Sequence, residues 1–156
     1  MGTDLKKILA GLEIFRDLAP EEFDKIVDFL EIKKYGKDEE IFHEKSLESD
    51  LYVVLEGRVK VQVELTKMDK ATFHTILPGK LFGEFSFIDG QPRSASAIAT
   101  ENSEVLKIPK DNLFALFKEN PRIGYCVMGS LSRILARRIR QTAHELKSSL
   151  MWESST

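Results

Sequence analysis

The spacing of hydrophobic positions changes twice along this chain and divides it into three parts. In the first 30 residues apolar side chains recur every three or four positions, as at Phe23, Ile26 and Leu30. This period predicts helix. Pro20, followed by two glutamates, is typical of a first helical turn. We therefore expect helices over residues 5–30, one of them beginning near Pro20.

From residue 31 to about residue 109 the period is two, as in β-strands. Residues 59–65 alternate apolar and polar side chains throughout. Further strand-like runs, bounded by turn residues, cover residues 51–55, 72–77, 94–100 and 104–108. Several short strands at this spacing predict a small barrel or jelly roll.

After residue 109 the pattern is helical again. Residues 111–118 predict a short helix, and Asn120-Pro121 is typical of a helix N-cap followed by proline. We expect a long helix from there to about residue 148. Its apolar stripe comprises Ile123, Val127, Leu131, Ile134, Leu135, Ile139, Thr142 and Leu146. This stripe is too wide for one contact, so we expect one side to cover the barrel and another to form a homodimer. A single amphipathic helix on its own domain is the alternative.

Composition narrows the class of protein. The 156 residues, 42% of them hydrophobic, suffice for one folded domain. A net charge of -2 argues against a broad nucleic-acid surface. No apolar stretch approaches the roughly 20 residues of a membrane span. The single cysteine, Cys126, cannot form an internal disulfide, and the amino terminus lacks a secretion signal. We therefore expect a cytoplasmic protein without a membrane partner.

Several kinds of chemistry have no matching pattern in the sequence. The three histidines, His43, His74 and His144, are far apart and lack paired ligand spacing, so we expect no metal site. Cys126 lies within the long helix without a nearby base, which favours a packed thiol. The basic run with Arg133, Arg137, Arg138 and Arg140 is most simply the solvated side of that helix. We expect that the protein is not an enzyme.

The run GEFSFIDGQPRSASA, residues 83–97, contains two charged residues in strand-rich sequence. Buried charges need partners, so Glu84 and Arg93 are expected to bind something. Arg93 offers a planar, permanently charged guanidinium that suits two phosphate oxygens. A short helical turn at residues 84–88 can direct N–H groups at the same anion. Glu84 repels phosphate but can accept from a sugar hydroxyl, so the pair predicts a nucleotide.

Gly83-Glu84 and Pro92-Arg93-Ser94-Ala95 resemble the phosphate-binding cassette of the cyclic nucleotide-binding domain family. This family includes catabolite activator proteins and regulatory subunits of cyclic AMP-dependent kinase. Glycine-marked turns at residues 55–59 and 77–84 also match. The resemblance implies one domain over residues 1–156, mainly β with flanking helices. Its parts are amino-terminal helices (1–30), an eight-stranded double-stranded β-helix or jelly roll (31–109) that contains the cassette (83–97), and closing helices (110–150).

The resemblance also implies roles for individual residues. The implied cassette contacts are Gly83, Glu84, Phe85, Arg93, Ser94 and Ala95. Among these, Glu84 is expected to accept from the ribose 2′-hydroxyl and Arg93 to pair with the cyclic phosphate. Gly83 and Phe85 are expected to offer backbone contacts, and Ser94 and Ala95 to assist at the phosphate.

Outside the cassette, residues 136–142 resemble the stretch that ends in the family's base-contacting threonine, so Thr142 is the expected purine contact. The next residue, a serine that reaches the partner subunit's ligand in the activator, is Ala143 here. This departure argues against cross-subunit recognition of the base. Val61 and His74 are further expected residues of the pocket, from strands that face the base.

The implied ligand is cyclic AMP, with cyclic GMP as the alternative. Activator-type family members have a helix-turn-helix after the long helix. Since this chain ends at residue 156, we expect no DNA binding. We expect a regulatory module that signals to an unknown effector protein by rearranging its carboxy-terminal helix. Two alternatives stay open: a nucleotide-blind interaction module in which Glu84 and Arg93 pair only with each other, and a truncated transcription factor.

Overall fold

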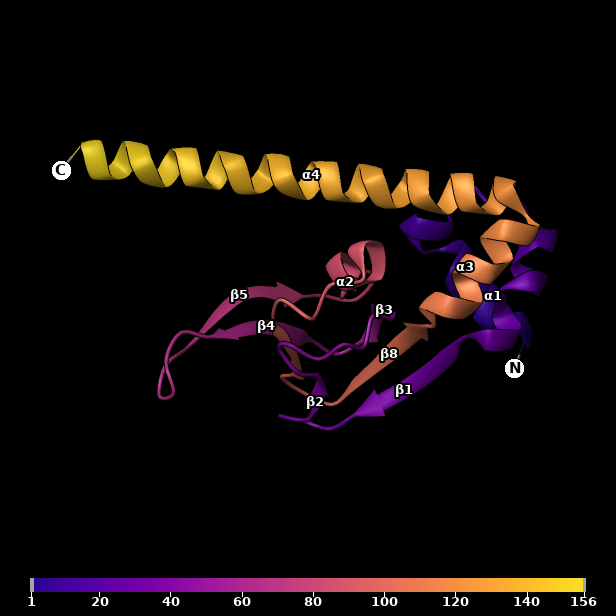
Figure 1. The fold of residues 1–156 in the computed structure, drawn as a ribbon, viewed down its shortest axis with the longest axis horizontal. Helices are drawn as coiled ribbons and strands as arrows, with labels where there is room; N and C mark the ends of the chain where they lie inside the picture. Colours follow the sequence, from indigo (N-terminus) through magenta and orange to yellow (C-terminus); the bar gives the residue numbers. More distant parts are fainter. Residues whose placement is uncertain (1, 156) are drawn as a thin grey trace. The chain divides into compact units, whose positions relative to one another are not determined.

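The computed structural model describes residues 2–155, which form two compact units. The β-roll unit, Ile26–Ala115, contains the strands, and the helical unit combines residues 2–25 with residues 116–155. Figure 1 traces the order of the elements along the chain. Among the described residues, none of the helices combines the length and hydropathy of a membrane span.

The strands of the β-roll unit form two antiparallel sheets, which confirms the predicted jelly roll with flanking helices. The strands are β1 (Glu31–Tyr35), β2 (Glu40–Phe42), β3 (Leu51–Glu56), β4 (Val59–Glu64), β5 (Lys70–Ile76), β6 (Leu81–Phe82), β7 (Ser96–Ala99) and β8 (Ser103–Ile108). One sheet has the order β1-β8-β3-β6, and the other has the order β2-β7-β4-β5. Figure 1 shows β4 and β5 as a long hairpin of this second sheet.

The core of the roll explains the pattern of its strands. Leu51, Tyr52, Val53 and Val54 are all buried, because β3 lies between β8 and β6 in its sheet. β5 is an edge strand and is mostly exposed. The interior cluster comprises Tyr52, Val54, Val59, Ile76, Phe82, Ala97 and Val105. Burial of each large member contributes about 1.5–3 kcal/mol.

A short helix, α2 (Glu84–Asp89), interrupts the strands within residues 83–97 and confirms the predicted helical turn. It lies between two glycines in the left-handed conformation, Gly83 with φ of 81° and Gly90 with φ of 69°. Other residue types adopt this conformation only at a cost, so the glycines define where the helix begins and ends.

The amino-terminal region is helical in several pieces, one of which begins at Pro20 as expected, but most of these pieces are 3-10 helices. It comprises α1 (Gly2–Ala10) and three 3-10 helices, η1 (Glu13–Phe15), η2 (Pro20–Lys25) and η3 (Val27–Phe29). Gly11 and Pro20 explain two of the breaks, because neither residue favours the interior of an α-helix. The backbone N–H of Ala19 donates to the Glu22 carboxylate at 2.8 Å, which caps η2.

The carboxy-terminal helices agree with the predictions and extend beyond them. α3 covers Lys110–Glu119, and α4 covers Pro121–Ser154, six residues past the expected end. The first half of α4 packs on η1 and has a buried side that includes Ile123, Val127, Leu131 and Ile134. Asn120 precedes Pro121 as expected, but its side chain accepts from Lys25 Nζ at 2.7 Å and makes no capping bond to the helix.

The basic side of α4 forms ion pairs with acidic residues of the amino-terminal segment. Arg133 pairs with Asp17 at 2.7 Å, and the other pairs are Arg122 with Glu22 and Arg137 with Glu13. Arg133 and Arg137 are exposed, as expected for the solvated side of the helix, and they also have acidic partners. These pairs join α4 to the segment that precedes the strands.

Candidate functional site

Arg93 is the most deeply buried charged side chain of the site. Its exposed fraction is 3%, and it lies between α2 and β7 in the β-roll unit. The Arg93 backbone N–H donates to the carbonyl of Ser46 at 2.8 Å, and its carbonyl accepts from the N–H of Lys45 at 2.7 Å. These two bonds attach the second part of the cassette to the loop between β2 and β3.

The guanidinium of Arg93 forms a salt bridge with Glu48, from that same loop. Nε and Nη2 both donate to Glu48 Oε2, at 3.1 and 2.6 Å. Nη2 also donates to the carbonyl of Asp50 at 2.6 Å, and Nη1 donates to the carbonyl of Gly83 at 2.7 Å. Because Arg93 pairs with Glu48, the alternative in which Glu84 and Arg93 pair only with each other is wrong.

Glu48 is satisfied on its other oxygen as well. Oε1 accepts from the backbone N–H of Asp50 at 2.8 Å and from the Tyr52 hydroxyl at 3.1 Å. Burial raises the pKa of the Tyr52 phenol, and the charge of Glu48 raises it further. Tyr52 therefore stays protonated and donates to the carboxylate.

The backbone of Gly83 contacts the guanidinium directly. A Cβ at this position would lie 2.8 Å from Arg93 Nη1 and 3.2 Å from the carbonyl oxygen of Asp50. Together with the φ of 81°, this contact explains why the chain has glycine here. The cassette residues Gly83 and Arg93 are thus in direct contact.

An aromatic ring covers one face of the guanidinium. Arg93 Cζ lies 4.0 Å from the centroid of the Phe42 ring. Phe42 in turn lies within 6 Å of the rings of Tyr52 and Phe82, which stack on each other at 5.3 Å. A cation over an aromatic face is stabilised by the charge distribution of the ring. The position of Arg93 is therefore determined by both hydrogen bonds and stacking.

The other cassette residues differ in exposure. Glu84 begins α2 and is half-buried, whereas Phe85 is 59% exposed. Ser94 is exposed, and Ala95 is buried. These residues are close to Arg93 in the sequence. Their contacts with a ligand stay predictions.

Val61 and His74 lie opposite each other in the second sheet. Val61 of β4 pairs with His74 of β5 on one side and with Ala97 of β7 on the other. Directly paired residues share a face of the sheet, and Ala97 belongs to the interior cluster. Val61 is partly buried against this cluster, whereas the side chain of His74 is exposed. Their contact with a ligand stays a prediction.

Thr142 lies on α4 in the helical unit, where its side chain is exposed. Its contact with a purine stays a prediction. All side chains of residues 139–155 are exposed, in contrast to the packed first half of the helix. Within residues 2–155 no group of three or more histidine, cysteine, aspartate or glutamate side chains is arranged to bind a metal ion.

Sequence reasoning missed Glu48 and Phe42. Both belong to the stretch around the loop between β2 and β3, and Glu48 lies 45 residues before Arg93 in the sequence. The only available signal was the general requirement that a buried arginine has a carboxylate partner. That requirement does not select Glu48 from among the acidic residues of the chain.

Comparisons with known proteins agree with this architecture. The sequence profile described as cyclic nucleotide-binding domain matches residues 32–120, more than half of the chain. The cyclic AMP receptor protein of Thermus thermophilus is 33% identical over 138 residues, which cover 88% of this chain and 62% of that protein. This chain thus spans less than two thirds of that relative.

Solved structures give the same result. The catabolite activator protein of Thermus thermophilus superposes with a TM-score of 0.72 at 34% identity, over 86% of this chain and 62% of that one. A cyclic nucleotide-binding domain from Methylobacillus flagellatus superposes with a TM-score of 0.79 at 25% identity, over 92% and 81% of the two chains.

Proposed function

Because this chain belongs to the cyclic nucleotide-binding domain family, we propose that it binds a cyclic nucleotide as a regulatory rather than catalytic module. The proposal depends mainly on one observation. Arg93, at the family's phosphate-binding position, is fixed by Gly83, Asp50 and Glu48 within the β-roll unit. A preorganised guanidinium of this kind suits a singly charged cyclic phosphate.

The ligand contacts follow from the site. Arg93, with Ser94 and Ala95, binds the phosphate, and Glu84 accepts from the ribose hydroxyl next to the backbone of Gly83 and Phe85. Val61 and His74 line the base from the inner face of the second sheet. Thr142 contacts the purine from α4. We favour cyclic AMP over cyclic GMP, and the cyclic AMP receptor protein among the relatives supports this choice.

Calorimetric titration with cyclic AMP and with cyclic GMP tests the proposal. We expect binding of cyclic AMP below millimolar concentration and weaker binding of cyclic GMP. Absence of binding of either nucleotide would refute it. Ser132→Ala, on the exposed side of α4, serves as a control that should bind like the parent.

One observation favours a nucleotide-blind interaction module as the second candidate. Arg93 already has a carboxylate partner, so its charge is compensated without a ligand. On this candidate, added nucleotide leaves the melting temperature of the parent and of Arg93→Ala unchanged. A rise in the melting temperature of the parent alone excludes it.

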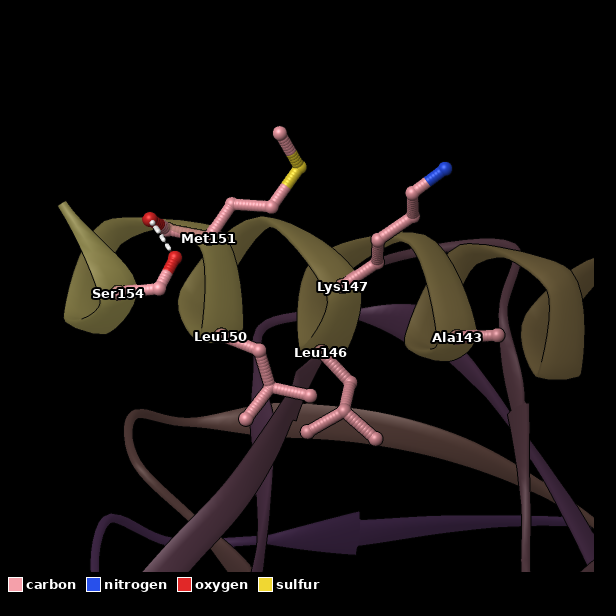
Figure 2. Close-up of a pocket in the computed structure, with 6 residues that line it drawn as sticks. All are labelled: Ala143, Leu146, Lys147, Leu150, Met151 and Ser154. Carbon is pink, nitrogen blue, oxygen red and sulfur yellow. Dashed lines mark hydrogen bonds between the residues drawn. The ribbon is translucent and has the colours of Figure 1, made fainter.

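We further propose that the second half of α4 forms a homodimer. Its exposed apolar residues Ile139, Ala143, Leu146 and Leu150 alternate at intervals of four and three, as in the seam of a coiled coil. Figure 2 shows Leu146 and Leu150 on the same side of the helix, away from Lys147 and Met151.

The charges beside this seam favour parallel helices. Arg140 and Lys147 each follow a seam residue, Ile139 and Leu146. In an antiparallel pair these basic residues would face each other and repel, whereas in a parallel pair they face neutral positions.

Sedimentation equilibrium of the parent, Leu146→Glu and Ser148→Glu tests the dimer. Each variant adds one negative charge, but Ser148 lies outside the seam. We expect Leu146→Glu to raise the dimer dissociation constant by at least about tenfold, because two leucines lose their burial. Equal effects of the two variants would contradict the seam.

We propose that the ligand signals by rearranging α4 toward an effector protein. Ligand contacts that favour one position of α4 must shift its equilibrium. Hydrogen exchange of residues 120–148 with and without cyclic AMP measures this effect. Unaltered exchange in the presence of saturating ligand would refute the mechanism.

A further inference from the structure

The hydrogen bonds of Arg93 leave little capacity for an additional anion. A guanidinium has five N–H groups. Four of the Arg93 N–H groups donate to protein oxygens, two of them to Glu48 Oε2 and the others to Asp50 and Gly83. A phosphate that takes two N–H groups must therefore displace one of these acceptors.

Glu48 is the acceptor that can be displaced. The Asp50 and Gly83 acceptors are backbone carbonyls, whose positions are fixed by the strand β3 and by the helix α2 that follow them. The Glu48 carboxylate is a side chain with 31% of its surface exposed, and only 2% of the Arg93 side chain is exposed. A rotation of Glu48 toward solvent releases two N–H groups of Arg93 at once. The same rotation breaks the bonds that Oε1 accepts from the Asp50 N–H and the Tyr52 hydroxyl, and these bonds oppose the displacement.

Carboxylate and phosphate oxygens use the same geometry on arginine. Glu48 Oε2 accepts from Nε and Nη2 together, which is the side of the guanidinium that a phosphate oxygen would approach. Glu48 also compensates the charge of Arg93. An approaching anion therefore meets a neutral ion pair, and its attraction to the site is weaker than its attraction to an unpaired guanidinium.

We propose that Glu48 is an internal competitor of the ligand phosphate for Arg93 and thereby determines the affinity of the site. This inference rests on the proposed cyclic nucleotide binding and assigns to Glu48 a role that the cassette sequence does not contain. Binding exchanges one anionic partner of Arg93 for another. Affinity then reflects the difference between the two partners rather than the strength of the phosphate contact alone.

The competing interpretation is that Glu48 only positions Arg93 for the ligand. The two interpretations predict opposite signs for Glu48→Gln. Glutamine keeps an acceptor oxygen near Arg93 but removes the charge, so a competitor role predicts that the dissociation constant for cyclic AMP falls by at least about tenfold. A positioning role predicts that it rises.

The experiment is calorimetric titration of the parent, Glu48→Gln, Glu48→Asp and the control Glu101→Gln with cyclic AMP. Glu48→Asp retains the negative charge and is expected to bind more like the parent than Glu48→Gln. Glu101 lies in an exposed turn. Glu101→Gln removes the same charge away from Arg93, so we expect it to leave the affinity for cyclic AMP unchanged. Equal or weaker binding by folded Glu48→Gln overturns the inference while the proposed function stands.

The exchange of Glu48 for phosphate as the partner of Arg93 can also be measured in the parent protein. This measurement does not depend on how well Glu48→Gln folds. The NMR signal of the Arg93 Nε–H group is expected to shift on titration with cyclic AMP, because its acceptor changes from carboxylate to phosphate. Binding with this signal unmoved overturns the exchange. Absence of binding by both the parent and folded Glu48→Gln refutes the proposed function and this inference with it.

Discussion

Two arginine–carboxylate pairs in this protein have similar lengths and very different surroundings. Arg93 and Glu48 meet at 2.6 Å with side-chain exposures of 2% and 31%, whereas Arg133 and Asp17 meet at 2.7 Å with exposures of 50% and 45%. In the first pair the guanidinium has exchanged water for protein acceptors. In the second pair both groups retain water and are screened by salt.

The comparison teaches that distance alone does not rank ion pairs. A buried charge that loses its partner is left without compensation, so its removal or isolation is costly. An exposed pair contributes little, because water replaces either partner. We therefore expect changes at Arg93 to affect stability and binding together, and changes in the pairs along α4 to affect neither strongly.

The largest effect is expected for Arg93→Ala. It leaves the carbonyls of Gly83 and Asp50 without their donor and removes the ring contact with Phe42. We expect a loss of about 3–5 kcal/mol of unfolding free energy, measured by urea denaturation. Cyclic AMP affinity should fall by roughly 10- to 1000-fold if one or two charged hydrogen bonds are lost. An unchanged stability would contradict the buried pair.

A smaller effect is expected for Gly83→Ala. The added Cβ meets Arg93 Nη1 and the Asp50 carbonyl, and the left-handed backbone disfavours alanine. We expect a cost of about 1–3 kcal/mol, with weaker cyclic AMP binding because Arg93 is displaced. Gly79→Ala is a useful control, since its φ is also positive but no atom lies within 4 Å of its Cβ position. Equal costs for the two variants would show that the contact with Arg93 is unimportant.

Varying the pH gives a further comparison between the ion pairs along α4 and the buried pair of Arg93. The backbone N–H of Ala19 holds the pKa of Glu22 below its ordinary value of 4.5, with help from Arg122. Because the folded pKa is lower than the unfolded one, this contribution is present above pH 4.5 and is lost as pH falls through the folded pKa. Glu22→Gln should therefore be less stable than the parent at pH 7, and the difference should narrow below pH 4.5. A difference that is constant with pH would contradict this assignment.

The smallest effect is expected for Asp17→Asn. It removes the charge that faces Arg133 while both groups stay in water. We expect a change within about 0.5 kcal/mol in urea denaturation, and a still smaller change at high salt. A loss comparable to that of Arg93→Ala would remove the distinction between the two pairs.

Long regular elements were predictable from the sequence, and short or broken ones were not. The alternation of β4 and the stripe of α4 follow from side-chain period alone. Strands as short as β2 (Glu40–Phe42) and β6 (Leu81–Phe82) have too few residues to show a period. The 3-10 helices preserve helical spacing at Phe23 and Ile26, so the sequence predicted helix there without indicating its 3-10 type.

The site was predictable in its local part. The motif placed Gly83 and Arg93 in one cassette, and the structure adds a direct hydrogen bond between them. Glu48 and Phe42 come from a distant, irregular stretch, and only the tertiary structure brings them to the guanidinium. Periodicity reports which face a residue occupies and contains no information about which loops meet.

The partners of Arg93 also have a consequence for the order of folding. Its side chain joins segments 45, 43 and 10 residues away in the chain, through Glu48, Asp50 and Gly83. Closing a loop of more than 40 residues costs chain entropy, and the contact stabilises the chain only after the loop has closed. We therefore expect the surroundings of Arg93 to form late, after the β4–β5 hairpin. A newly made chain would then acquire a complete phosphate site only when the whole roll has formed.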